Sequence, residues 1–137
     1  MEDKLSGDEK RHSKRVRVSL SVVYRVNEPL TVRFLTGDRE IKATILDLSE
    51  DGIAVSTDYD IPPTTVMAMR FTLFKIDKED VSFYGPMEIT GEVRYGFRKD
   101  GECRLGIKFV KIEEDDKREI ANFINMARDL MDKEQKT

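Results

Sequence analysis

The chain has 137 residues, the length of one small domain with a modest core. Charged residues make up 37% of it, yet the formal net charge is only −3, which argues against a general nucleic-acid binder held by bulk electrostatics. Its single cysteine, Cys103, excludes an intrachain disulfide and fits a reducing compartment. No apolar run reaches the roughly 20 residues that span a bilayer, and the polar first residues lack a signal-peptide core, so we expect a cytoplasmic protein with no transmembrane segment.

The first third of the chain alternates between polar breaks and strand-like segments. Residues 1–14 hold almost no apolar side chains, and we predict a flexible N-terminal arm there. In residues 16–22 apolar and polar side chains alternate, which is typical of a half-buried strand. Residues 30–35 are predicted to form a second strand, and residues 36–38 a hairpin-type turn that leads into a third strand over residues 41–47.

The middle of the chain continues with strand signals. Residues 53–55 begin a short strand, and residues 67–73 alternate through a longer one. The charged segment 75–86 is expected to be an exposed loop with some strand extension. Residues 89–97 and 104–112 flank a Lys-Asp-Gly-Glu turn, which indicates a β-hairpin.

The last segment changes to a helical period. Apolar side chains recur between Ile120 and Met131 as one stripe over three turns, and acidic residues at 113–116 favour a helix start there. The stripe is expected to cover an open side or end of the sheet, and a homodimer through the same helix is the alternative. We therefore predict a mainly β domain over residues 15–134: an antiparallel six- to seven-stranded β-barrel with a C-terminal α-helix.

Two polar motifs stand out in this framework. The first places Arg11 and Arg15 four residues apart, at the junction between the arm and the first strand. The second is Asp47-Leu48-Ser49-Glu50-Asp51-Gly52, which joins two predicted strands. Taken alone, the first motif is an ordinary solvated charge run and the second an ordinary polar turn, because Asp, Ser and Gly all favour turns for local reasons.

Taken together, the order and spacing of the two motifs resemble the PilZ family. The late segments Gly91-Glu92-Val93-Arg94-Tyr95 and Arg104-Leu105-Gly106-Ile107-Lys108-Phe109 resemble the late strands of that family, and a closing helix is common there. The resemblance covers residues 10–131. It implies a split-barrel fold that binds the bacterial messenger cyclic di-GMP on its surface, with the arginine arm folding over the ligand.

The resemblance also implies which residues bind. Arg11 and Arg15 take the family's two arginine roles, and Asp47, Ser49 and Gly52 take those of the second motif. The chemistry agrees, because a guanidinium matches a phosphate or the O6/N7 edge of guanine with paired hydrogen bonds. A carboxylate accepts from guanine N1 and N2, a serine hydroxyl donates or accepts, and a glycine leaves room where a ligand approaches the backbone.

We therefore predict a non-enzymatic sensor with cyclic di-GMP as ligand and no cofactor or metal. The arm is expected to order when ligand binds and so to change the surface that an unidentified protein partner reads, with an output in motility, biofilm formation or polysaccharide production. The arginine spacing permits one ligand or an intercalated pair. The negative charges of Glu50 and Asp51 beside a dianionic ligand oppose binding. The alternative is a ligand-independent interaction module with the same fold.

Other classes fit the sequence less well. The second motif matches the first half of an EF-hand calcium loop, but Asp58 stands where that loop needs glutamate, and the flanks alternate like strands. The only histidine, His12, lies in the arm without a structured nucleophile to serve, and no histidine–cysteine cluster exists for zinc. The aromatic residues are scattered and form no obvious stacking platform for nucleic acid.

Overall fold

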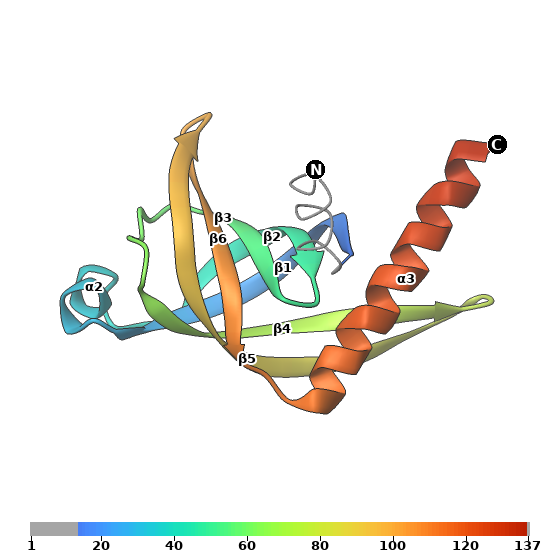
Figure 1. The fold of residues 1–137 in the computed structure, drawn as a ribbon, viewed down its shortest axis with the longest axis horizontal. Coiled ribbons are helices and arrows are strands. Elements are labelled where there is room, and N and C mark those ends of the chain that lie inside the picture. The colour runs from blue at the N-terminus through green and yellow to red at the C-terminus, as the bar shows by residue number, and fades with distance from the viewer. Residues whose placement is uncertain (1–13, 137) are drawn as a thin grey trace, which may run out of the picture.

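Six strands account for most of the chain in the computed structural model, which describes residues 14–136. Two helices accompany them in this range, a short one between the first two strands and a long one at the C-terminal end (Figure 1). The strands are β1 (Arg15–Glu28), β2 (Ile41–Ser49), β3 (Gly52–Thr57), β4 (Val66–Asp77), β5 (Asp80–Lys99) and β6 (Glu102–Lys111), and the helices are α2 (Leu30–Leu35) and α3 (Glu114–Lys136).

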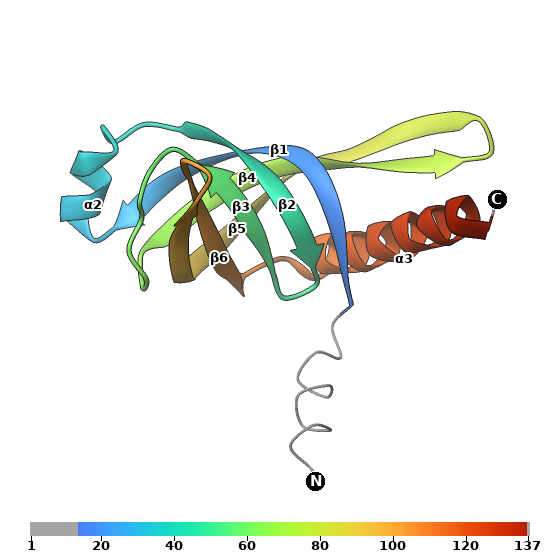
Figure 2. The same cartoon turned by 90° about the horizontal axis from the view of Figure 1, so that it is seen from above.

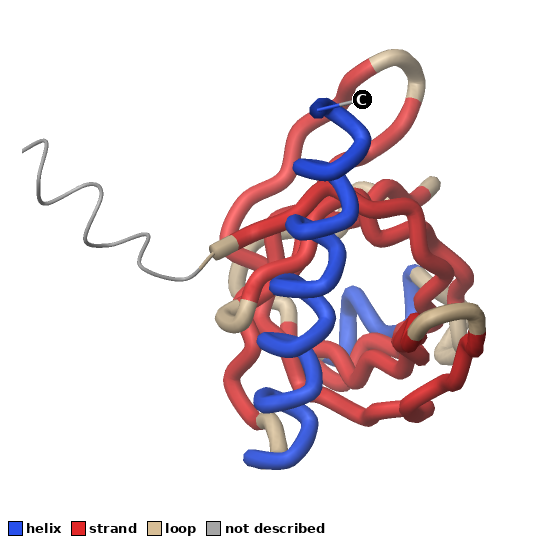
Figure 3. The backbone as a smooth tube through the Cα atoms, turned by 90° about the vertical axis from the view of Figure 1, so that its right-hand side faces the viewer, coloured by secondary structure: helices blue, strands red, loops and turns tan. Residues whose placement is uncertain are grey.

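Each strand pairs antiparallel with two neighbours, in the order β1-β2-β3-β6-β5-β4. The ring closes because β1 also pairs with β4 (Figure 3). The predicted mainly β, antiparallel architecture with a C-terminal helix is thus confirmed, with six strands in the described part of the chain. The predicted arm, residues 1–14, falls almost wholly outside the described residues.

The core lies inside the ring and is filled by the alternate apolar side chains of the strands. Because successive strand residues face opposite sides, the period-two pattern of the sequence places one set of side chains inside. The largest fully buried side chains of the strands are Tyr24, Ile45, Leu48, Met67, Met69, Leu73, Met87, Ile89 and Leu105.

Helix α3 crosses one end of the ring, where it contacts β1, β2 and β4 (Figure 3). The first half of its apolar stripe is buried there through Ile120, Phe123 and Ile124, as expected for a helix that covers the barrel. The later stripe residues Leu130 and Met131 remain 41% and 44% exposed, because α3 continues past the ring. Between residues 14 and 136, no helix is long and apolar enough to cross a membrane.

The predicted strand over residues 30–35 is wrong, because this segment is the helix α2 at the opposite end of the ring (Figure 2). Backbone hydrogen bonds of helical spacing define it, with Arg33 N donating to Pro29 O at 3.0 Å and Thr36 N to Val32 O at 3.1 Å. Val32 is buried, whereas Phe34 is 66% exposed. A short apolar run carries no period of its own, so the contact of α2 with β1 decides the outcome.

The charged segment 75–86, predicted as an exposed loop with some strand extension, is a full two-stranded extension of β4 and β5 beyond the ring (Figure 2). The base of the extension contacts α3. The rings of Phe74 and Phe123 meet edge-to-face with centroids 5.1 Å apart, and Ile76 N donates to the thioether of Met126 at 3.3 Å. Packing against α3 thus supports strand pairing that the charged sequence does not signal.

Candidate functional site

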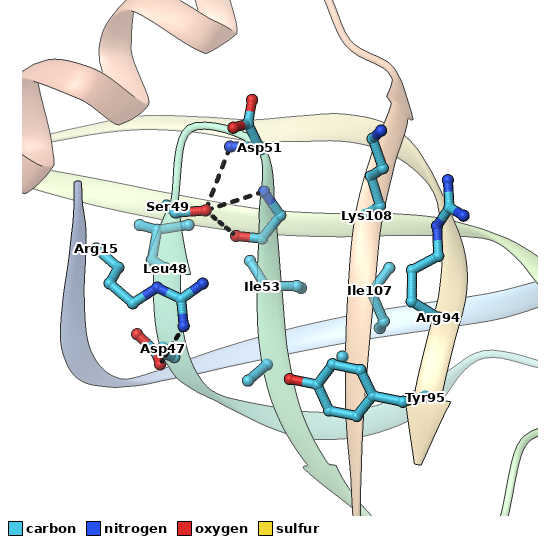
Figure 4. A pocket seen from close by; sticks show the side chains of 13 residues that line it. Arg15, Asp47, Leu48, Ser49, Asp51, Ile53, Arg94, Tyr95, Ile107 and Lys108 are labelled. Carbon is cyan, nitrogen blue, oxygen red and sulfur yellow. Dashed lines mark hydrogen bonds and ion pairs between the residues drawn. The ribbon is translucent and has the colours of Figure 1, made fainter. Parts of the chain in front are cut away.

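The two sequence motifs meet at one hollow of about 190 Å³ on the outer wall of the barrel. It lies over β2, β3, β6 and β5, beside the start of β1 and the turn between β2 and β3 (Figure 4). Of the five predicted ligand residues, Arg11 lies outside the described part of the chain. The other four, Arg15, Asp47, Ser49 and Gly52, all line this hollow.

Ser49 builds the turn between β2 and β3. Its Oγ accepts hydrogen bonds from the backbone N–H of Asp51 at 3.3 Å and of Gly52 at 3.2 Å, and it donates to Gly52 O at 3.2 Å (Figure 4). The side chain is nearly buried and replaces water at these backbone groups. Ser49 therefore shapes the loop that carries the motif, and direct contact with a ligand stays a prediction.

The backbone of β6 lies too close to position 52 to leave room for any residue other than glycine. A Cβ at this position would lie 2.2 Å from the carbonyl oxygen of Ile107, because Gly52 pairs with Lys108 across β3 and β6. The same end of the strand pair is held by Phe109 N donating to Asp51 O at 2.8 Å. The glycine is expected from the sequence to leave room for a ligand, but the folded chain alone already excludes a side chain here.

Asp47 has an acceptor atom with no partner. Its Oδ2 lies 3.8 Å from Nη1 of Arg15, whereas Oδ1 is buried without a hydrogen-bond partner among residues 14–136. A buried carboxylate oxygen without a donor is unfavourable, so a turn of the side chain that brings this oxygen to a ligand donor would be stabilising. The Arg15 side chain is 62% exposed, and an exposed pair at this distance contributes little. Arg15 can therefore turn to an anion at small cost.

Late strands contribute residues that the sequence analysis did not assign to the site. Three cationic side chains, Arg15, Arg94 and Lys108, line the hollow together with two carboxylates, Asp47 and Asp51. The local balance is therefore slightly positive although the whole chain is acidic, which favours an anionic ligand.

Strand alternation carries a signal for one of these two late-strand residues. Lys108 occupies an outward position in β6 between the buried Ile107 and Phe109, whereas Arg94 follows the buried Val93 at a point where the register of β5 with β6 shifts and the alternation breaks. A lone polar residue at such a position has many ordinary explanations. Only the strand order, which sets β6 between β3 and β5, brings these cations beside the motif loop.

Solved structures with the same fold were found in three bacteria. The inhibitor of motility MotI/DgrA of Bacillus subtilis matches with 18% identity and a TM-score of 0.66, over 88% of this chain and 51% of that chain. The PilZ domain of YcgR from Escherichia coli, solved with c-di-GMP, matches with 13% identity and a TM-score of 0.60, over 93% of this chain and 99% of that chain. A tetrameric PilZ domain protein of Xanthomonas campestris, self-assembled through a helical bundle, matches with 9% identity and a TM-score of 0.59, over 93% and 96%.

This chain spans about half the length of the B. subtilis protein that it matches, so the likeness there concerns one part of that protein. Comparisons of the sequence then identify the family. Among curated proteins, no sequence matches the chain. The model of the PilZ domain family matches residues 9–126, which include both motifs and all six strands. With most of its length inside this match and with the fold of solved PilZ domains, the chain belongs to the PilZ domain family.

Proposed function

We propose that the chain binds cyclic di-GMP in the hollow beside the β2–β3 turn and acts as a non-enzymatic sensor for a protein partner. The observation that carries the proposal is the meeting of two motifs that are distant in sequence: Arg15 at the start of β1 lies against Asp47 at the end of β2. The hollow is open to solvent on the outer wall, as a ligand with two phosphates and two guanines requires. Membership of a family of ligand-binding adaptor modules supports the same conclusion.

The lining chemistry fits the ligand group by group. The carboxylate of Asp47, whose side chain is 28% exposed, accepts from N1–H and N2–H of a guanine. Arg15 donates to a phosphate or to the O6/N7 edge of guanine. Arg94 and Lys108 neutralise further phosphate charge from the other side of the hollow.

The start of β1 links the site to α3. The backbone oxygen of Arg15 accepts from Nη1 of Arg128 at 3.2 Å, so the residue proposed to bind the ligand also contacts the C-terminal helix. We propose that binding draws Arg15 and Arg11 onto the ligand, orders residues 1–14 and alters this contact. A partner then reads the changed surface of the arm and α3.

The proposed output is control of motility, supported by the fold likeness to the motility inhibitor of B. subtilis. Biofilm formation or polysaccharide production as output, a cytoplasmic location and a homodimer through α3 stay predictions from the sequence. The X. campestris protein is a tetramer self-assembled through a helical bundle, and this makes α3 the element to test for self-association in this chain.

The test is a calorimetric titration of the full chain with cyclic di-GMP, with GTP and cyclic di-AMP as controls. We expect selective binding at micromolar or tighter concentration. Arg15→Ala and Asp47→Ala should each weaken it by about 5- to 150-fold, the value of one bidentate base or phosphate contact. Arg39→Ala is the matched control, because Arg39 is an exposed arginine that precedes β2 at the α2 end and lines no part of the hollow.

The second candidate function is a ligand-independent interaction module. It is favoured by the finding that Ser49 and Gly52 each have a role in the fold that needs no ligand. Absence of heat and of amide chemical-shift changes at millimolar cyclic di-GMP would decide for this alternative.

A further inference from the structure

A row of directly paired residues crosses the outer wall of the barrel beside the motif loop. The register pairs β1 with β2, β2 with β3, β3 with β6, and β6 with β5 at this level. The members of the row, in order, are Arg17, Asp47, Ala54, Gly106 and Tyr95. The charged and aromatic side chains therefore stand at the two ends of the row, and the smallest ones lie in its centre.

The centre of this row is a floor without large side chains. Ala54 carries only a methyl group and Gly106 none, so the strip between Asp47 and Tyr95 is hollow. The hollow of the motif loop and a neighbouring one of about 390 Å³ share three residues of the row: Asp47, Ala54 and Tyr95. Arg104 and Arg17 line the neighbouring hollow as well and add positive charge at its far rim.

The ring of Tyr95 lies across Gly106 rather than standing out from the wall. A Cβ at Gly106 would come within 2.2 Å of two ring carbons of Tyr95 and 2.6 Å of its hydroxyl oxygen. The ring extends from β5 over β6 toward β3 (Figure 4). Phe97 stacks beside it with centroids 6.4 Å apart and an interplanar angle of 16°.

This aromatic pair contributes little to the core. Tyr95 and Phe97 are 53% and 51% exposed, on the face of the sheet opposite to the buried side chains. One face of the Tyr95 ring rests on the Gly106 backbone, so the exposed part of the ring faces the hollow and solvent. A fixed aromatic face at the edge of a hollow lined by cations is the usual arrangement for stacking a nucleobase.

We propose that Tyr95 is the stacking platform for one guanine of cyclic di-GMP, whose Watson–Crick edge reaches Asp47 across the floor of Ala54 and Gly106. The inference rests on the proposed function and adds the position of a base. Neighbouring strands lie about 4.8 Å apart, and Asp47 in β2 is three such spacings from Tyr95 in β5, so their backbones are separated by about 14 Å. Because the ring of Tyr95 lies over Gly106, the distance that remains between the ring and Asp47 is one that a single purine can span. A flat purine stacked on the outer face of the ring extends over Ala54 toward the carboxylate of Asp47, whose side chain is 28% exposed.

The two contacts have different consequences for specificity. Stacking accepts any base, because every base has a π-face, whereas Asp47 selects guanine through its N1–H and N2–H donors. Adenine offers an acceptor at N1 and gains nothing there. Tyr95 should therefore set affinity without setting the preference for cyclic di-GMP over cyclic di-AMP, and Asp47 should set both.

The inference is tested by titrating cyclic di-GMP and cyclic di-AMP into three variants of the full chain. Tyr95→Ala should lower the affinity for cyclic di-GMP by about 5- to 150-fold, the effect of losing one base–aromatic stack, and Tyr95→Phe by no more than about twofold. Phe83→Ala should have no effect, because Phe83 is an even more exposed aromatic residue, at 75%, that lies on the β4–β5 extension outside both hollows. Thermal melts establish that each variant is folded.

A second measurement keeps the inference testable if Tyr95→Ala does not fold. In the wild-type chain, saturating cyclic di-GMP should move the ring-proton resonances of Tyr95 upfield, as a stacked purine requires. Ring resonances that stay in place in the ligand-bound protein, or a folded Tyr95→Ala variant that binds within about twofold of wild type, would overturn the platform while leaving the proposed function intact. Failure of the wild-type chain to bind any cyclic di-GMP would instead overturn the proposed function.

Discussion

Gly52 offers the sharpest separation between folding and ligand binding, because it belongs to the motif and yet is required by the barrel. In Gly52→Ala the new Cβ would stand 2.2 Å from Ile107 O, about 1 Å closer than van der Waals contact allows. Both atoms are attached to paired strands, so no rotamer change relieves the overlap. The strands β3 and β6 must separate at the pair Gly52 and Lys108.

The magnitude follows from three contributions. Overpacking in a well-packed region costs about 1–3 kcal/mol. Separation of the strands also weakens the 2.8 Å hydrogen bond from Phe109 N to Asp51 O, which adds about 1 kcal/mol. The smaller entropy of the unfolded alanine chain offsets about 0.5 kcal/mol. The net expectation is a loss of about 1.5–3.5 kcal/mol, or a Tm lower by about 10 °C at the middle of this range for a domain of this size.

The assay is urea and thermal unfolding of the ligand-free protein, followed by circular dichroism. Gly96→Ala in β5 is the matched control, because its Cβ would meet the movable Leu105 Cδ2 at 3.0 Å and should cost less than about 1 kcal/mol. If Gly52→Ala unfolds within 0.5 kcal/mol of wild type but no longer binds cyclic di-GMP, the steric argument is refuted, and the glycine serves the ligand alone.

Three further predictions concern the tyrosines and α3. Burial raises the pKa of Tyr24 to about 12, above the ordinary value near 10, so the folded state holds this proton more tightly than the unfolded chain does. Stability should therefore not depend on Tyr24 ionisation below pH 10 and should fall by about 2 kcal/mol between pH 10 and 12, and Tyr24→Phe should abolish that fall in urea titrations run at each pH. The hydrogen bond that Tyr84 donates to Asp116 at 2.8 Å raises the pKa of Tyr84 to about 12, so its phenol absorbance step should lie there and move down in Asp116→Asn; an unchanged step would show that the bond is absent in solution. Arg128→Ala should leave the unfolding free energy within about 0.5 kcal/mol but speed amide exchange in the last turns of α3, and unchanged exchange would mean that the contact with Arg15 O does not hold the helix.

Much of the fold could be predicted from local patterns. Alternation is a property of each strand by itself, so most strands can be predicted from the sequence. The helical spacing of apolar residues from Ile120 onward likewise predicts α3. The turn at Asp100-Gly101 was also readable, because both residues adopt positive φ, of 53° and 81°, as a two-residue hairpin turn requires. Each of the two motifs is ordinary by itself, and they could be recognised because their order and spacing together resemble one family, whose model covers both of them.

Tertiary structure decided what local patterns leave open. The apolar run of α2 suits a strand or a helix equally, and only its place at the end of the ring, with Val32 buried, makes it helical. The role of Gly52 depends on the backbone of Ile107, which lies far away in sequence. It therefore cannot be predicted from the motif alone. The neighbourhood of Asp47 and Tyr95 exists because the ring places β6 between β3 and β5, an order that pairing across the whole barrel sets and that no segment of the sequence specifies by itself.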